Sequence, residues 1–193
     1  KKRDFFRYFL SLIGLSIFSS CTTVPVTNRK QLNIVPDKWI RWVSDKYYYD
    51  FLDDNLLIRD LEMYNRVYNI GLKIQNGIKK YFEIKKLDFK QYNLDYEIKV
   101  VDEQKTLNAF AMANAKVVFF RRTVEICEND DQIAAIMGHE MGHVIAKHIH
   151  ERISQRLTWD VLTLGIAELF AQLGFFLPWS RKQESEADYL GVV

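Results

Sequence analysis

The segment at residues 139–143, which reads HEMGH, constrains the fold most, because its polar side chains share one surface only on a helix. Residues four positions apart lie on the same helical face, so both imidazoles would point the same way. Apolar residues recur around the segment at helical spacing: Ile133, Ile136, Met137, Val144 and Ile145. Asn129, followed by Gln132 three residues later, is typical of a helix start. The pattern predicts one helix from Asn129 to about Leu157.

Two histidines and a glutamate at this spacing are typical of a zinc site. Zinc accepts neutral imidazole nitrogens, and a rigid helix would hold His139 and His143 at a fixed separation. Glu140 would then lie close enough to take a proton from a water that attacks a carbonyl group. The alternative is a solvated cluster of polar side chains, which the capped, half-apolar helix disfavours. The remaining histidines, His148 and His150, are assigned to surface or packing roles.

A catalytic zinc site commonly uses three protein ligands, so one more is needed downstream. Ser180 and Gln183 form a second capping pattern, which predicts a helix through Leu190. Within that helix Glu184 and Asp188 lie four residues apart on one face. Glu184 can supply a carboxylate ligand, and Asp188 can accept a hydrogen bond from the other ring nitrogen of a ligand histidine. The predicted ligands of one zinc ion are then His139, His143 and Glu184.

Elsewhere the sequence predicts a mixture of helix and strand. Apolar residues at steps of three and four predict a long amphipathic helix over residues 55–82. Alternating apolar residues predict strands at 94–100, 107–112 and 116–120. Residues 113–114 would form the turn between the last two, because asparagine tolerates the left-handed conformation. The apolar residues 158–177 predict a core or membrane-apposed helix. The expected fold class is α+β, mainly helical, with a small antiparallel sheet beside the HExxH helix.

Residues 1–20 have the layout of an export signal. Three basic residues open the chain, and an apolar run from Phe5 to Phe18 leads through small residues to Cys21. The run is too short to span a membrane comfortably. A cysteine at this point is typical of a lipidated N-terminus; an ordinary signal peptide or an N-terminal anchor is the alternative. We predict a lipoprotein-type signal over 1–20, an extended tether over 21–37 and the main domain over 38–193.

This layout predicts an exported protein, anchored in the bacterial cell envelope on the periplasmic side through a lipidated Cys21. Thr22 follows the cysteine in place of an aspartate that would favour the inner membrane, so the outer membrane is favoured. Cys127 follows an apolar stretch and is expected to be a buried thiol. The formal net charge of +2 gives no reason to expect a nucleic-acid partner.

The pairing of HEMGH with a later ESEAD at residues 184–188 resembles the zinc metallopeptidases of the HtpX and CAAX prenyl protease type, which are gluzincins. The likeness is strongest with the exported lipoprotein members and covers nearly the whole chain. It includes further matching segments at residues 23–33, 108–111, 151–154 and 178–181. The resemblance assigns the metal to His139, His143 and Glu184, the catalytic carboxylate to Glu140 and a supporting role to Asp188.

The resemblance implies a zincin-like fold and an endopeptidase of the cell envelope that hydrolyses misfolded or membrane-associated polypeptides. Asn108, Ala109 and Phe110 match a strand that lines the substrate cleft in the family. Family members continue beyond the counterpart of Asp188 with further helices and a residue that stabilises the oxyanion. We therefore expect the domain over 38–193 to lack its C-terminal part.

Two other classes of protein stay open. A non-catalytic envelope lipoprotein could bind or chaperone proteins on the same scaffold. Residues 113–115 favour that reading, because they replace a Pro-Gly-Gly turn of the family, whereas the two intact metal motifs oppose it. A structural or storage zinc protein would instead close the metal with four protein ligands.

Overall fold

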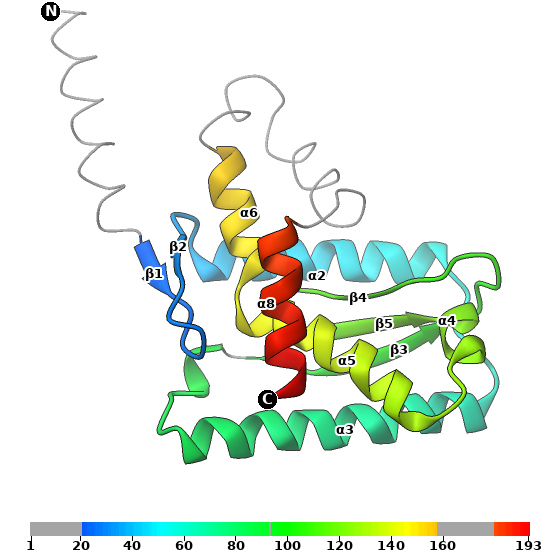
Figure 1. The fold of residues 1–193 in the computed structure, drawn as a ribbon. Helices are drawn as coiled ribbons and strands as arrows, with labels where there is room; N and C mark the ends of the chain where they lie inside the picture. Colours follow the sequence, from blue (N-terminus) through cyan, green and yellow to red (C-terminus); the bar gives the residue numbers. More distant parts are fainter. Residues whose placement is uncertain (1–20, 93, 158–179) are drawn as a thin grey trace, which may run out of the picture.

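The computed structural model describes residues 21–92, 94–157 and 180–193 (Figure 1). The predicted export signal over 1–20 and the apolar stretch over 158–177 lie outside these residues. In chain order the elements are β1 (Cys21–Thr23), β2 (Lys30–Leu32), α2 (Asp37–Asp54), α3 (Leu61–Ile84), a 3₁₀ turn (Lys90–Tyr92), β3 (Glu97–Val101), β4 (Ala109–Ala111), β5 (Lys116–Phe120), α4 (Arg121–Ile126), α5 (Asp130–Ile145), α6 (His148–Leu157) and α8 (Arg181–Val192). Among these described helices, none is both long and apolar enough to cross a membrane.

The strands at the centre of the molecule confirm the α+β class. They form a three-stranded sheet in the order β3-β5-β4. The β4–β5 pair is antiparallel as predicted, with Phe110 opposite Val118, but β3 runs parallel to β5, with Ile98 opposite Val117. The central sheet is therefore mixed rather than purely antiparallel. In the part of the chain that the structure describes, β4 forms one outer edge of this sheet.

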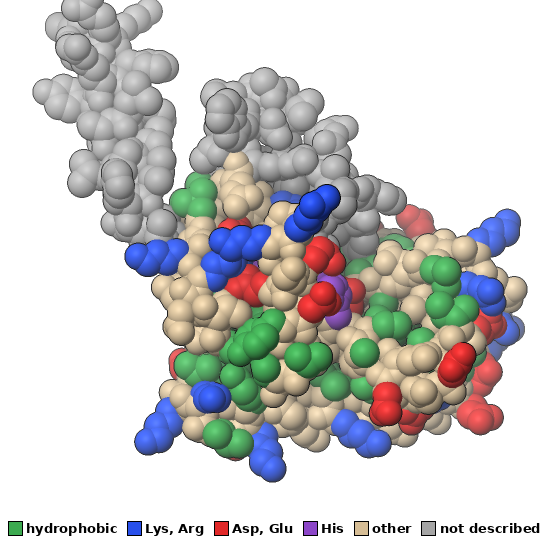
Figure 2. All heavy atoms as spheres, in the orientation of Figure 1, with side chains coloured by type: hydrophobic (Ala, Val, Ile, Leu, Met, Phe, Trp, Pro, Cys, Tyr) green, Lys and Arg blue, Asp and Glu red, His purple; other side chains and the backbone are tan. Residues whose placement is uncertain are grey.

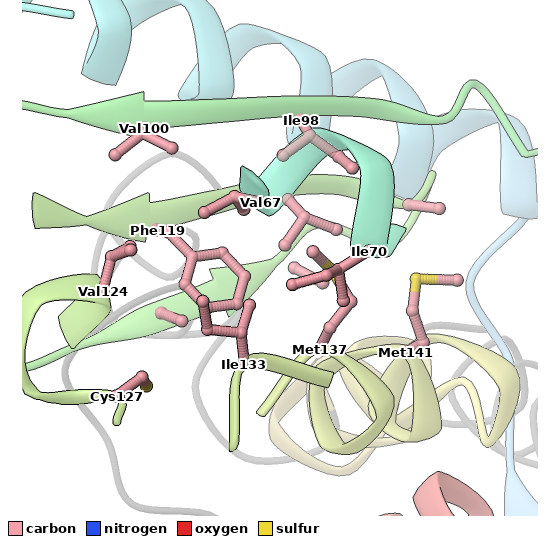
Figure 3. Packing of buried hydrophobic residues seen from close by; sticks show 14 of the residues in the cluster. Val67, Ile70, Ile98, Val100, Phe119, Val124, Cys127, Ile133, Met137 and Met141 are labelled. Carbon is pink, nitrogen blue, oxygen red and sulfur yellow. The ribbon is translucent and has the colours of Figure 1, made fainter. Parts of the chain in front are cut away.

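The sheet separates two hydrophobic clusters, so helices cover both of its faces (Figure 1). One face packs on α3 and α5, where Val67, Met137 and Phe119 are completely buried. Figure 3 shows these side chains pointing toward one another between the strands and the two helices. The other face packs on α2 through Tyr48 and Phe110. Burying each such side chain contributes about 1.5–3 kcal/mol, so the α5 backbone is firmly placed against the sheet.

The long amphipathic helix predicted over 55–82 corresponds to α3, but it begins at Leu61. The Asp60 carboxylate caps it by accepting hydrogen bonds from the backbone amides of Glu62 and Met63, both at 3.0 Å. The preceding residues run along the sheet instead, where the amide of Ile58 donates to Val100. Helix α2 was not predicted, because Pro36 precedes it and no side chain caps its start.

The N-terminal segment differs from the extended tether predicted over 21–37. Strands β1 and β2 pair antiparallel, with Cys21 opposite Leu32, and form what we call the N-terminal hairpin, residues 21–32. Val24, in the turn of this hairpin, is fully buried. Just beyond it, the amide of Ile34 donates to the Ser154 hydroxyl of α6 at 3.0 Å. The hairpin is held by contacts to residues more than a hundred positions away in the chain. Local sequence patterns therefore could not predict it.

The single helix predicted over 129–157 is two helices. Helix α5 ends at Ile145, and Lys147 adopts a left-handed conformation with φ 52° before α6 begins. The Lys147 ammonium lies 2.9 Å from the Asp37 carboxylate at the start of α2, which fixes the reversal. No glycine marks this break, although glycine is the usual residue at such a position. As a result His148 and His150 are buried, which suits a packing role and excludes a surface one.

The turn between β4 and β5 also differs in detail. The left-handed residue is Ala115, with φ 65°, rather than Asn114. Asn114 is held elsewhere, because its side-chain amide donates to the Asp45 carboxylate of α2 at 2.6 Å. A tertiary hydrogen bond has therefore overridden the local turn preference of asparagine. Cys127 is a free, buried thiol, as predicted.

Candidate metal centre

Helices α5 and α8 cross at unusually short range because glycines face each other at the crossing. A Cβ atom on Gly142 would lie 2.6 Å from the backbone oxygen of Ala187. One on Gly138 would lie 2.7 Å from the backbone oxygen of Gly191. Such distances cannot be reached by any residue with a side chain, so glycine allows this approach. The close crossing brings the first turn of α8 beside the HEMGH segment of α5 (Figure 1).

Three predicted ligands converge at this crossing. His143 Nε2 lies 3.1 Å from His139 Nε2. Glu184 reaches both rings, with oxygens 3.5 Å from His139 Nε2 and 3.8 Å from His143 Nε2. A tetrahedral zinc with bonds of about 2.0–2.2 Å requires ligand atoms about 3.3–3.5 Å apart. The three residues therefore fit a zinc ion, and in the described part of the chain they form the group suited to holding a metal.

Asp188 lies where the sequence placed it, beside the first ligand. Its carboxylate is 2.7 Å from His139 Nδ1. A carboxylate can only accept, so Nδ1 must carry the proton and Nε2 keeps its lone pair for a metal. For His143, burial lowers the pKa of the imidazole far below its ordinary value. The Nε2 atoms of both rings are thus the nitrogens that face the metal position.

Glu140 is half-buried beside the ligands, and its surroundings change its acidity. Burial, with a smaller contribution from the nearby charge of Glu184, raises the pKa of its carboxyl to about 8. A backbone hydrogen bond from Ala111 of β4 acts in the opposite direction. A cation bound at the adjacent site would also lower this pKa. The carboxyl is therefore suited to exchanging protons near neutral pH.

A hollow of about 430 Å³ opens next to these residues. His139, Glu140 and Asp188 of the two helices line it, together with Asn108 and Ala109 at the start of β4. Its remaining lining is mostly apolar and consists of Leu107, Thr123, Ile126, Ala135 and Ile136. In the space-filling view, acidic side chains lie beside a visible histidine near the middle of the face, and apolar side chains gather on both sides of it (Figure 2).

The sequence of residues 72–193 matches the model of peptidase family M48. The chain belongs to peptidase family M48. The metallopeptidase family inferred from the two motifs is thus confirmed at this level. The narrower assignment to the HtpX and CAAX prenyl protease type, in its lipoprotein branch, stays a prediction.

The individual proteins that this chain resembles are also metallopeptidases by name. The chain is 27% identical over 190 residues to "Mitochondrial metalloendopeptidase OMA1" of Schizosaccharomyces pombe, which covers 93% of this chain and 54% of that protein. It is 33% identical over 108 residues to the Arabidopsis thaliana protein of the same name, covering 52% of this chain and 22% of the relative. A match of 28% over 98 residues to "Metalloprotease LoiP" of Escherichia coli covers 44% and 38%. The chain therefore spans about half or less of these relatives.

Of the three predicted substrate-binding residues, two lie at the M48 site and one is turned away. Asn108 and Ala109 line the hollow next to Glu140. The Phe110 ring packs on the opposite face of the sheet, with its centroid 5.2 Å from that of Phe51 in α2. Successive side chains of a strand point to opposite faces, so Phe110 can contribute only its backbone to the cleft.

Sequence reasoning missed the residues behind the second ligand. His148 Nδ1 lies 2.8 Å from His143 Nδ1, and Glu186 contacts the far side of the His148 ring at 2.9 Å. Glu186 lies two residues after Glu184, so helical spacing turns it away from the metal. Helical spacing gives the direction of the Glu186 side chain but not its neighbour. The break at Lys147 places His148 between Glu186 and His143, and the local sequence did not predict that break.

Proposed function

We propose that this chain is a zinc-dependent endopeptidase. The observation that carries the proposal is the convergence of His139, His143 and Glu184 on one point, with Glu140 beside them. Three protein ligands leave a tetrahedral metal one open position, which catalysis requires and a structural site lacks. The names of the relatives, metalloendopeptidase and metalloprotease, support the same reaction class.

Each residue around the site has a separate role in peptide hydrolysis. A bound zinc ion would polarise the scissile carbonyl and acidify the attacking water. Glu140 accepts a proton from that water and then delivers it to the leaving amine, a transfer that a pKa near neutrality favours. Asp188 holds the His139 ring in the metal-binding tautomer. The hollow bounded by Asn108 and Ala109 is where the polypeptide would lie.

The deciding experiment combines proteolysis with metal analysis. Wild-type protein and Glu140→Gln are incubated with fluorescently labelled casein, with and without a chelator, and their zinc content is measured. We expect wild type to cleave and to be inhibited by the chelator. We expect Glu140→Gln to retain zinc while cleavage falls by about 10²–10⁴-fold, the usual contribution of a general base.

Two outcomes would contradict the proposal. Cleavage that persists in Glu140→Gln would remove the carboxylate from the mechanism. Zinc-loaded wild type that binds casein without cleaving it would favour the rival, a non-catalytic envelope protein built on the same scaffold.

The proposed setting is the bacterial cell envelope, where the substrates would be misfolded or membrane-associated proteins. The support is the basic and apolar order of residues 1–20 before Cys21. A lipid on Cys21 would hold the peptidase at the membrane, and the absence of an aspartate at position 22 favours the outer one. Cys21→Ser should release the protein from the membrane fraction and abolish incorporation of labelled palmitate. Membrane association that survives this substitution would overturn the lipid anchor.

A further inference from the structure

A continuous line of contacts runs from the ligand His143 to the N-terminal hairpin. The first contact joins His143 Nδ1 to His148 Nδ1 at 2.8 Å, and the second joins His148 Nε2 to Glu186 Oε2 at 2.9 Å. The same Glu186 oxygen lies 2.5 Å from Arg29 Nε. His148 is completely buried and Glu186 nearly so, so water does not compete strongly for these contacts.

The proton positions along this line follow from the acceptor at its end. Glu186 is a carboxylate paired with Arg29 and accepts only, so His148 Nε2 must carry a proton. At the other end of the line, His143 Nε2 faces His139 Nε2 and the Glu184 carboxylate, so it is the nitrogen that a metal there would bind, and the ring proton belongs on Nδ1. His143 Nδ1 must then be the donor in the 2.8 Å contact. The result is a His143 ring whose Nε2 lone pair faces the metal position.

Arg29 is the residue that holds this arrangement from the outside. Its guanidinium also contacts Glu151 of α6 through two nitrogens, at 2.7 and 2.9 Å. Glu151 in turn accepts a hydrogen bond from Gln183 of α8 at 3.0 Å. Thr27 of the hairpin donates a further hydrogen bond to Glu186. One cation from the hairpin therefore neutralises two buried carboxylates, one on each of two helices.

We propose that Arg29, acting through Glu186 and His148, is a positioning residue for the metal ligand His143. The proposal rests on the zinc site of the proposed function. Without Arg29, the buried carboxylates of Glu186 and Glu151 lose the guanidinium that contacts both of them. Repulsion between the two carboxylates then turns Glu186 away from His148, which loses the hydrogen bond that orients its ring. His143 is released to take the other tautomer, which presents an N–H to the metal.

The test measures zinc affinity directly, by competition with a chromophoric chelator, on the full chain. Loss of an outer partner of a metal ligand usually costs 10–100-fold in metal affinity. We expect Arg29→Ala to weaken zinc binding by about 10-fold and His148→Phe, one step nearer the metal, by up to about 100-fold. Arg29→Lys should give an intermediate value, because an ammonium keeps the charge but cannot contact both carboxylates in the forked geometry.

The matched control is Lys116→Met, which removes another buried cation. Lys116 is 1% exposed and pairs with Asp45 at 2.8 Å, without contact to the metal ligands. The Lys116→Met variant should lower the thermal stability, as Arg29→Ala does, but should leave the zinc affinity unchanged. A second control, Lys30→Ala, changes an exposed neighbour in the hairpin and should alter neither quantity.

The outcomes separate this inference from the proposed function. Wild-type zinc affinity in Arg29→Ala, or an equal loss in Lys116→Met, would overturn the positioning role while leaving the peptidase intact. A wild-type protein that binds no zinc would overturn both. If Arg29→Ala does not fold, Arg29→Lys decides, since it changes the same residue and keeps the charge of the hairpin; wild-type zinc affinity in Arg29→Lys would then overturn the positioning role.

Discussion

His139 and His143 present their Nε2 atoms to one point because the other nitrogen of each ring is already engaged. The two rings are held differently. Asp188, which holds His139, is an exposed carboxylate on the surface of α8, whereas His143 is held by a buried imidazole. An exposed hydrogen bond competes with water, so the His139 ring depends on helix geometry as well as on Asp188.

Removing the Asp188 carboxylate should weaken the site without destroying it. We expect Asp188→Ala to lower zinc affinity by about 10-fold, the lower end of the range for such partners, because the contact is exposed. Chelator competition measures this change. The control is Asp131→Ala, which removes an exposed carboxylate from α5 and should leave zinc affinity unchanged. Equal affinities in wild type and Asp188→Ala would show that the 2.7 Å contact does not orient the ring.

At the scale of elements, the centre depends on how closely α5 and α8 approach each other. Glu184 can reach both imidazoles only because Gly142 lies against the backbone of Ala187. The same two helices bear all three ligands, so a change in their spacing acts on the metal directly.

A methyl group at this crossing should therefore separate the ligands. We expect Gly142→Ala to push α8 outward, lower stability by about 1–3 kcal/mol through overpacking and abolish tight zinc binding. Thermal unfolding and zinc titration measure the two effects. Gly77→Ala is the matched control: nothing lies within 4 Å of a Cβ there, so this α3 variant should be stabilised by about 0.5–1 kcal/mol. Undiminished zinc affinity in Gly142→Ala would mean that the close crossing does not set the ligand geometry.

The junction of α2 with α6 predicts a pH effect away from the metal. A hydrogen bond from His150, and another from Lys147, hold the pKa of Asp37 below its ordinary value of 3.8. A carboxyl with a lowered folded-state pKa stabilises the fold above about pH 4, and this contribution is lost as the pH falls further. Asp37→Asn should lower stability by about 1 kcal/mol at pH 7, discounted because the group is partly exposed.

The measurement is urea unfolding of wild type and Asp37→Asn between pH 3 and pH 7. The difference between the two proteins should shrink as the pH falls below 4. A difference that is constant over this range would mean that the charge of Asp37 contributes nothing.

The elements that could be predicted are those with local signals. Helix α8 has its capping box of Ser180 and Gln183, and α5 has the Asn129 cap, so both starts were correct. Helical spacing paired His139 with His143 and Glu184 with Asp188, and the ligand number of zinc, with the family resemblance, joined the two pairs at one metal. The break at Lys147, helix α2 and the N-terminal hairpin were missed because tertiary contacts fix them, such as the Lys147–Asp37 pair and the Arg29 cluster. Local patterns cannot show contacts between residues that are distant in the chain.

At the scale of the whole molecule, the centre joins parts of the chain that are far apart. The ligands come from α5 and α8, and the contacts behind them come from the hairpin and α6. The sheet and α3 pack against the buried face of α5 (Figure 3). A metal bound at such a junction stabilises the entire fold, since the unfolded chain does not hold its ligands together.

Zinc removal should therefore lower the unfolding temperature as well as abolish cleavage. At free zinc 1,000-fold above the dissociation constant, binding contributes about 4 kcal/mol to the free energy of unfolding. Calorimetry with and without chelator measures the shift, and added zinc should restore it. Glu140→Gln is the control, because it should show the full shift while lacking activity. An unfolding temperature that does not respond to zinc would place the metal outside the folded core.

The close crossing of α5 and α8 has a consequence for biosynthesis. Residues 130–145 leave the ribosome well before residues 181–192, and the carboxylate ligand arrives only with the later segment. Until that segment has emerged and docked, a growing chain carries two imidazoles but no complete centre. In the peptidase proposed above, a nascent chain would therefore not cleave itself or its neighbours while its own core is still exposed.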